Sequence, residues 1–214
     1  MNKQTNQRQE DYSDVIYRLD GPLRWATQEN IKIIEKAEIQ SGWKVLDVGS
    51  GTGYLTIPAA QKVAPHGCVE CIDEVLELQN VIRTKAQKLN LENNINLQLA
   101  DASELPFPDN YFDAVISSYL LHEIPESSPK LLAEAYRVLK KGGKFVVADF
   151  MRIDDDIRRI EIDNWFSAQG KDDDKEIHLR YSRQDLENML KEAGFCNVEV
   201  SIWNEYHMHG KGVK

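Results

Sequence analysis

The sequence predicts an α/β fold, in which a mostly parallel, doubly wound sheet of seven strands carries helices on both faces. Apolar runs of strand length alternate along the chain with amphipathic stretches of helical period. Such alternation is typical of parallel sheets, because the chain must cross one face of the sheet between two parallel strands. In addition, the strand Val45–Val48 leads into a glycine-rich turn and a helix, an arrangement that places a ligand at the carboxyl ends of the strands.

The expected elements follow one another in a regular order. Helices are expected over about 22–39, 54–63, 74–90, 130–141 and 182–195, and strands over 45–48, 68–73, 95–100, 112–118, 144–150 and 198–203. The first helix takes its apolar face from Trp25, Ile31, Ile34 and Ala37.

Capping residues mark the ends of the last two helices. Ser128 is expected to cap the helix that begins at Pro129, with Lys140 and Lys141 in its last turn. Ser182 is expected to cap the final helix, and Gly194 to end it. The stretch 205–214 contains His207 and His209, which we interpret as part of a solvated edge strand rather than a metal site, since no third ligand follows.

Length and charge indicate a single globular domain. The chain has 214 residues, and we expect a disordered arm over 1–14, one domain over 15–214, and an insertion over 151–181 that covers the substrate. The insertion is expected because 151–181 breaks the alternation and contains two acidic triplets, Asp154–Asp156 and Asp172–Asp174, which we interpret as solvated turns.

Composition also disfavours several classes of protein. The net charge of −9 disfavours a nucleic-acid surface, because phosphates are neutralised by clustered Lys and Arg. No apolar run has the ~18 residues of a membrane span, and the polar start lacks the apolar centre of a secretory signal. Three cysteines are too few for a disulfide framework, so we expect a cytoplasmic protein. We interpret the pair Cys68 and Cys71 as core residues, and the sequence leaves a homodimer open.

The stretch VLDVGSGTGYLTI, which contains the glycine-rich turn, indicates the charge of the ligand that binds there. Gly49, Gly51 and Gly53 have the spacing G-x-G-x-G, whereas the dinucleotide fingerprint is G-x-G-x-x-G. A carboxylate at Asp47 would repel a diphosphate but suits a ligand with a cationic group. S-adenosylmethionine is such a ligand, because it has an ammonium, a sulfonium, one carboxylate and no phosphate. Its carboxylate can use the loop amides while Asp47 pairs with the ammonium.

Two further strand ends carry acidic residues. Asp73 ends the second strand, 20 residues after Gly53, where a carboxylate can accept from both ribose hydroxyls. Asp101 and Ala102 end the third strand, where a carboxylate can accept from the adenine amino group and a backbone amide can reach the ring. Together these positions predict a complete site for S-adenosylmethionine.

With these residues, the chain resembles the class I S-adenosylmethionine-dependent methyltransferases. The resemblance runs from about Gln40 to Ile202 through VLDVGSGTG, VECID, ADASELPFPDNYFDAVISS and AYRVLKKGGKFVVADF. It is closest to the small-molecule branch that includes the ubiquinone and menaquinone biosynthesis enzymes and the arsenite methyltransferases. The resemblance implies a Rossmann-like fold, S-adenosylhomocysteine as product, and cofactor roles for Asp47, Gly49, Gly51, Thr52, Gly53, Asp73, Asp101, Ala102 and Ser118. Glu74 departs from the apolar residue that is usual there, which leaves Val75 to pack against the adenine.

The sequence gives a less specific signal for the methyl acceptor than for the cofactor. After the fourth strand, SSYLLHEIPE lacks the Asn/Asp-Pro-Pro-aromatic motif of nitrogen methylation and the Pro-Cys of pyrimidine C5 methylation. No Asp-Asp-Asn magnesium set is present, so metal-independent transfer to a small molecule is expected. The cysteine positions disfavour arsenite as the acceptor. His122 is the candidate general base, although the simpler interpretation is that it ties the loop to Glu123 or to a backbone carbonyl.

Aromatic residues complete the expected site. The candidates for an apolar acceptor pocket are Tyr17, Trp25, Tyr119, Phe150, Trp165 and Tyr181. Other functions stay open from sequence: an RNA or protein methyltransferase, a non-catalytic regulator that binds S-adenosylmethionine, and a nicotinamide-dependent dehydrogenase. The glycine spacing and Asp47 disfavour the dehydrogenase.

Overall fold

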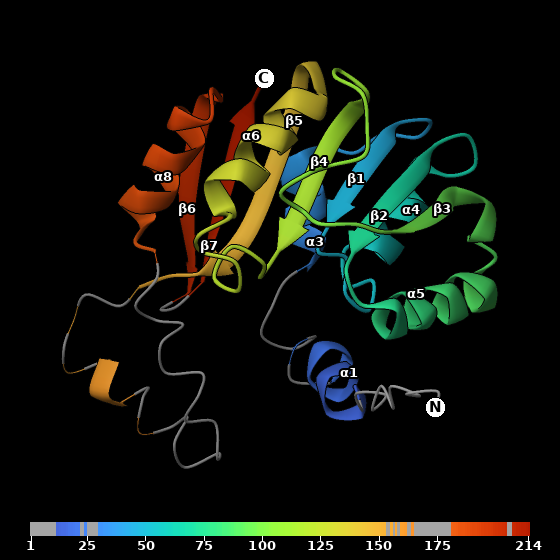
Figure 1. Cartoon of the computed structure of the whole chain (residues 1–214), viewed down its shortest axis with the longest axis horizontal. Coiled ribbons are helices and arrows are strands. Elements are labelled where there is room, and N and C mark those ends of the chain that lie inside the picture. The colour runs from blue at the N-terminus through green and yellow to red at the C-terminus, as the bar shows by residue number, and fades with distance from the viewer. Residues whose placement is uncertain are drawn as a thin grey trace, which may run out of the picture.

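A computed structural model of the chain (Figure 1) describes residues 12–21, 24, 30–152, 155, 157, 159–161, 164, 181–204 and 207–214. Its elements are α1 (Ser13–Asp20), α3 (Asn30–Ala37), β1 (Lys44–Val48), α4 (Thr56–Val63), β2 (Cys68–Asp73), α5 (Leu76–Leu89), η1 (Glu92–Asn94), β3 (Ile95–Leu99), β4 (Phe112–Ser118), α6 (Ser128–Val138), β5 (Leu139–Phe150), α8 (Arg183–Glu192), β6 (Cys196–Asn204) and β7 (His207–Val213). The predicted arm lies mainly outside the described residues, as does most of the predicted insertion over 151–181.

The seven strands form one sheet in the order β3-β2-β1-β4-β5-β7-β6. The first five strands along the chain pair in parallel, and β7 pairs antiparallel with both β5 and β6. The predicted seven-stranded, mostly parallel sheet is therefore confirmed. The strand order reverses between β1 and β4, so the carboxyl ends of these two strands mark the point where such sheets bind ligands.

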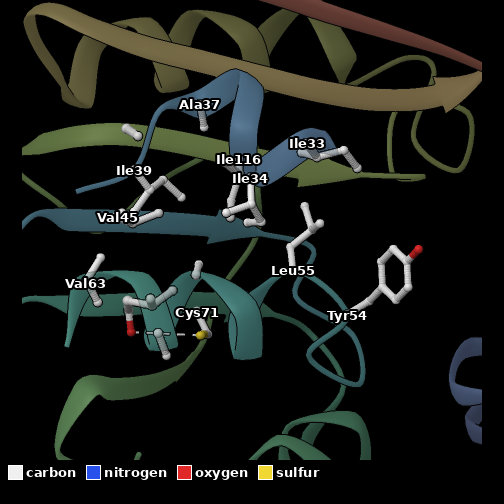
Figure 2. Close-up of a cluster of buried hydrophobic side chains, with 14 of the residues drawn as sticks. Ile33, Ile34, Ala37, Ile39, Val45, Tyr54, Leu55, Val63, Cys71 and Ile116 are labelled. Atoms are coloured by element: carbon white, nitrogen blue, oxygen red, sulfur yellow. Dashed lines mark hydrogen bonds between the residues drawn. The ribbon is translucent and has the colours of Figure 1, made fainter. Parts of the chain in front are cut away.

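Two apolar layers hold helices against opposite faces of the sheet. Side chains alternate along a strand, and in β1 Val45 belongs to the layer under α3, α4 and α5, whereas Leu46 belongs to the layer under α6 and α8. Figure 2 shows the first layer, in which Ile34 of α3 lies next to Ile116 of β4, and Ile39, after α3, lies next to Val45. Cys71 is a buried member of this layer, as predicted, whereas Cys68 is only half-buried and belongs to neither apolar layer, so that part of the prediction is wrong.

Several local predictions need correction. The buried residues of α3 are Asn30, Ile33, Ile34 and Ala37, while Ile31 is 55% exposed. The helix α6 begins at Ser128, which is its first residue rather than its cap; Ser127 is the N-cap. The helix ends at Val138 because Leu139 pairs with Phe112, and Lys140 and Lys141 therefore belong to β5. At α8 the prediction is confirmed: Ser182 forms a capping box with Asp185, and Gly194 follows in the left-handed region.

The C-terminal strand is also different from the prediction. The strand β7 lies between β5 and β6, so the edge of the sheet is β6 and the interpretation of a solvated edge strand is wrong. His207 and His209 are 3% and 2% exposed. Both rings pack against aromatic neighbours: His209 stacks on Trp203, and His207 packs on Phe150. Within the described ranges, no helix has the length and apolarity that crossing a bilayer would require.

Candidate active site

The loop that follows β1 depends on glycine for both its conformation and its packing. Gly49, Gly51 and Gly53 have φ values of +70°, +51° and +88°, a region that residues with a side chain rarely adopt. A Cβ at Gly49 would lie 2.8 Å from Cδ2 of Leu120, in the segment that follows β4. The glycine loop and the acceptor-side segment are therefore in direct contact.

Asp73 organises this loop from the end of β2. Its Oδ2 accepts a hydrogen bond from the Gly51 amide at 2.8 Å, and its Oδ1 accepts one from the Val75 amide at 2.9 Å. Neighbouring Glu74 is exposed and Val75 is half-buried, as expected if Val75 is the packing residue at this position. The carboxylate thus fixes the glycine loop in addition to any contact it makes with a ligand.

Asp47 lies under the loop and is almost completely buried. Its side chain is 1% exposed, and the Thr56 hydroxyl donates to Oδ2 at 2.6 Å. The pKa of Asp47 is raised to about 7, mainly by burial and in part by nearby Asp73, while the hydrogen bond from Thr56 and the charge of Arg24 oppose the rise. Because ionising this buried carboxylate is costly, a positively charged ligand would stabilise its ionised form.

The helix α1 reaches the glycine loop from outside the sheet. Figure 1 shows α1 beyond the carboxyl ends of β1 and β2. The Leu19 carbonyl accepts hydrogen bonds from the Thr52 hydroxyl at 3.3 Å and from Arg24 at 3.2 Å. Lys85 of α5 donates to Asp20 and, at 2.8 Å, to the Thr52 carbonyl. This part of the site was missed from the sequence, where only Tyr17 of this helix was proposed.

Aromatic rings gather next to the loop. Tyr119, the residue after β4, has φ +56°, a strained conformation that is rare for a bulky residue. Its ring lies 5.0 Å from that of Phe150 and 5.5 Å from that of His207. The Arg24 guanidinium lies 4.5 Å above the Tyr54 ring and 5.7 Å from the Tyr119 ring. A cationic group is therefore already accommodated between aromatic faces at this place.

His122 and Asp149 form a buried pair beside these rings. His122 is 5% exposed, and its Nδ1 lies 2.7 Å from Oδ1 of Asp149, which is fully buried near the end of β5. The other ring nitrogen, Nε2, lies 3.3 Å from Oε1 of Glu123. Burial lowers the pKa of His122, but the hydrogen bonds to Asp149 and Glu123 outweigh this effect and raise the pKa to about 9. The loop tie to Glu123 is therefore present, together with a partner that the sequence analysis had missed.

Asp149 could have been found from one signal in the sequence. It is a carboxylate inside the apolar strand KFVVADF, and a charged group is rarely buried without a partner. The partner comes from a separate segment of the chain, so only the fold identifies it as His122.

Comparison with known proteins decides the family. A family model described as a methyltransferase domain matches residues 39–194. The chain belongs to this family. It is 33% identical over 180 residues, 78% of this chain and 69% of the relative, to the ubiquinone/menaquinone biosynthesis C-methyltransferase of Vibrio campbellii. It is 29% identical, over 80% of this chain and 75% of the relative, to the demethylmenaquinone methyltransferase of Symbiobacterium thermophilum. A crystal structure of an S-adenosylmethionine-dependent methyltransferase from Aquifex aeolicus superposes with a TM-score of 0.73 at 26% identity, covering 93% and 96% of the two chains.

The chain is thus an S-adenosylmethionine-dependent methyltransferase, and its residues fit that cofactor. The glycine loop offers backbone amides at a site of close approach, and buried Asp47 offers a carboxylate for a cation. Thr52 and Ser118 are buried near the same strand ends. Asp101 is exposed beyond β3, where Oδ1 accepts from the Ser103 amide at 2.7 Å, and Ala102 is half-buried. The individual cofactor contacts of these residues stay predictions.

Not all the predicted pocket residues of this methyltransferase come together. Tyr119 and Phe150 are in contact, and half-buried Tyr181 donates to the Pro125 carbonyl at 3.4 Å. Tyr17 is 74% exposed, and the structure does not bring it to the aromatic cluster. Trp25 and Trp165 lie outside the described residues. Within the described part of the chain, no three His, Cys, Asp or Glu side chains are grouped as metal ligands.

The raised pKa of Asp47 predicts that cofactor binding depends on pH. The ammonium of S-adenosylmethionine favours the ionised carboxylate, which predominates only above a pKa of about 7. We expect the dissociation constant to rise up to about tenfold for each pH unit below 7, with a plateau above it. Calorimetric titration at several pH values measures this, and Asp47→Asn should bind weakly with little pH dependence. An affinity that is constant from pH 5.5 to 8 would contradict the role of Asp47.

Proposed function

We propose that this methyltransferase transfers the methyl group of S-adenosylmethionine to a small-molecule acceptor without a metal ion, and that His122 removes the acceptor's proton. The proposal is carried by the buried His122–Asp149 pair, with Nδ1 and Oδ1 2.7 Å apart. A histidine that only tied a loop would not need a fully buried carboxylate behind it, because burying that charge is costly.

The pair is close to the cofactor loop in the fold. Leu120 lies two residues before His122 and packs so closely on Gly49 that a side chain at Gly49 would clash with it. Tyr119 directly precedes Leu120 and its ring contacts Phe150, which in turn packs edge-on against His122 at 4.9 Å. An acceptor held between the glycine loop and these rings would therefore be within reach of His122.

For methyl transfer the protein must mainly align the acceptor with the methyl group and remove a proton from the acceptor. When bound, S-adenosylmethionine supplies a methyl group on a sulfonium, a good leaving group for in-line displacement. In the neutral form of His122, which predominates above its pKa of about 9, Asp149 holds the proton on Nδ1 and leaves Nε2 as the nitrogen that accepts a proton from the acceptor. Asp149 also stabilises the imidazolium that results, and its own Oδ1 is oriented by the Phe150 amide at 2.7 Å. The half-buried rings of Tyr119 and Phe150 help to shield His122 from water.

A small acceptor is favoured over a macromolecule. The net charge of −9 does not suit RNA, and the Vibrio campbellii relative is by name a C-methyltransferase of ubiquinone/menaquinone biosynthesis. Quinone-type and phenolic acceptors are therefore the first to be tested, ahead of thiols and amines.

A panel assay tests the proposal. The purified chain is incubated with S-adenosylmethionine, EDTA and, in turn, phenols, reduced quinone precursors, thiols, amines, RNA and a peptide mixture. Formation of S-adenosylhomocysteine and of the methylated product is followed by mass spectrometry. We expect transfer to a phenolic or quinol acceptor that EDTA does not affect and that His122→Gln lowers at least about 100-fold. Transfer to RNA or peptide alone, or tight cofactor binding without transfer to any acceptor, would overturn the proposal.

A further inference from the structure

We propose that Thr56 is a positioning residue of the cofactor site: its hydroxyl, oriented by the Cys71 thiol, holds the buried carboxylate of Asp47 in the charged form that binds the ammonium of S-adenosylmethionine. The inference rests on the predicted contact between Asp47 and that ammonium, and it does not depend on the role of His122. It assigns a part in cofactor binding to two residues whose side chains are completely buried.

Three polar side chains from three elements meet under the glycine loop. Asp47 of β1 lies directly opposite Cys71 of β2 in the parallel pairing, so their side chains point to the same face of the sheet. The helix α4 covers this face, and Thr56 is its first residue. Asp47 is 1% exposed, and Thr56 and Cys71 are both 0% exposed. Bulk water therefore does not supply the hydrogen bonds of these groups.

The hydrogen bonds run in one direction, from the thiol to the carboxylate. An ionised carboxylate only accepts, so Thr56 donates its hydroxyl proton to Oδ2 of Asp47 at 2.6 Å. This length is that of a charge-assisted O–H···O⁻ bond, ~2.5–2.7 Å. The Thr56 oxygen in turn accepts from the Cys71 thiol at 3.5 Å, whereas the Val69 carbonyl is farther from the thiol, at 3.9 Å. The thiol thus orients the hydroxyl with its proton towards Asp47.

The Thr56 hydroxyl has the largest effect among the groups that favour a charged Asp47. Burial raises the pKa of Asp47, and the hydrogen bond from the hydroxyl opposes this rise more than the charge of Arg24 or the Thr56 backbone amide does. A hydrogen bond to the charged form of an acid stabilises that form. Without the hydroxyl, we therefore expect the pKa to lie above about 7 and the carboxyl group to stay largely protonated at neutral pH.

The ionisable groups around Asp47 do not replace the hydroxyl. Among the described residues, those that act on its charge are Asp73 and Cys71 of β2 and Arg24. Asp73 raises the pKa of Asp47, and burial raises the pKa of the Cys71 thiol, which stays neutral. Arg24 favours the charged carboxylate, but its effect is smaller than that of the hydroxyl. On β4, the residue in register with Asp47 is Ile116, which carries no charge.

The test compares two substitutions of Thr56 in the full-length protein. Thr56→Val keeps the shape of the side chain without the hydroxyl, and Thr56→Ser keeps the hydroxyl. Calorimetry gives the dissociation constant of S-adenosylmethionine from pH 5.5 to 8. In wild type and Thr56→Ser the affinity should level off above about pH 7. In Thr56→Val it should still rise up to pH 8 and be several-fold weaker at pH 7.5, because a raised pKa moves the loss of charge to higher pH.

Cys71→Ala tests the orienting thiol and leaves Thr56 in place. The pH at which affinity levels off should move in the same direction as in Thr56→Val, but by less, since the hydroxyl can still donate to Asp47. A pH profile of Cys71→Ala identical to that of wild type would overturn the role of the thiol.

Proton release on binding separates this role from general damage to the fold. Titrations in buffers of different ionisation enthalpy count the protons released per cofactor bound. At pH 7.5 Thr56→Val should release more than wild type, because more of its Asp47 is protonated beforehand. The same pH profile and the same proton release in both proteins would overturn the role of Thr56, even where wild-type affinity depends on pH. A wild-type affinity that is constant with pH would overturn the Asp47 contact and this inference together.

Discussion

Asp149→Asn is expected to lower the rate of methyl transfer by about 10²–10⁴-fold, the range in which a positioned base contributes to catalysis. The Asp149 carboxylate lies 2.7 Å from Nδ1 of His122 and is fully buried, so no water can replace it. An amide at this position no longer stabilises the imidazolium, and it can orient the ring with the wrong nitrogen protonated. The measurement is kcat with a saturating acceptor from the panel, combined with calorimetry of S-adenosylmethionine binding, which should be unchanged.

A double variant separates catalysis from general damage to the fold. If Asp149 acts through His122, then Asp149→Asn combined with His122→Gln should be about as slow as His122→Gln alone, because residues that act as a unit are not additive. Methyl transfer within about threefold of wild type in Asp149→Asn would show that the buried pair is structural.

Asp73→Ala should weaken the binding of S-adenosylmethionine by about 1–3 kcal/mol, which is roughly 5- to 150-fold in dissociation constant. The substitution removes the acceptor of two amide hydrogen bonds, from Gly51 at 2.8 Å and Val75 at 2.9 Å, and so releases the glycine loop. It also removes the carboxylate that is predicted to bind the ribose hydroxyls.

Calorimetry with S-adenosylmethionine and S-adenosylhomocysteine measures the effect of Asp73→Ala. The matched control is Glu74→Gln, which changes the exposed neighbouring carboxylate and should bind both compounds like the wild type. Unchanged affinity in Asp73→Ala would remove Asp73 from the cofactor site.

The parts of the fold that were predicted correctly are those with strong local signals. The strand 112–118 was predicted to the residue as β4, because FDAVISS is a short, almost entirely buried run between polar turns. The cap at Ser182 was also predicted correctly, because this interaction is local: Ser182 and Asp185, three residues apart, form the capping box between them. The order of strand ends around the glycine loop followed from the alternation of helices and strands.

The parts that were missed depend on contacts between distant segments. The strand β7 has polar residues and two glycines, HMHGKGV, and it becomes an interior strand only because β5 and β6 pair with it on both sides. Similarly, α1 reaches the site through Lys85 of α5, which lies 65 residues from Asp20 along the chain. The partner of His122 is 27 residues away on β5. None of these pairings leaves a local pattern in the sequence.

The pH dependence of kcat/KM for the acceptor, measured at saturating S-adenosylmethionine so that Asp47 does not contribute, tests the central claim most directly. With a pKa of about 9 for His122, the account predicts that kcat/KM rises about tenfold per pH unit from pH 7 and levels near pH 9. His122→Gln should be slow and lack this rise. A profile that is flat between pH 6 and 10, or one that His122→Gln leaves intact, would contradict the assignment of His122 as the base.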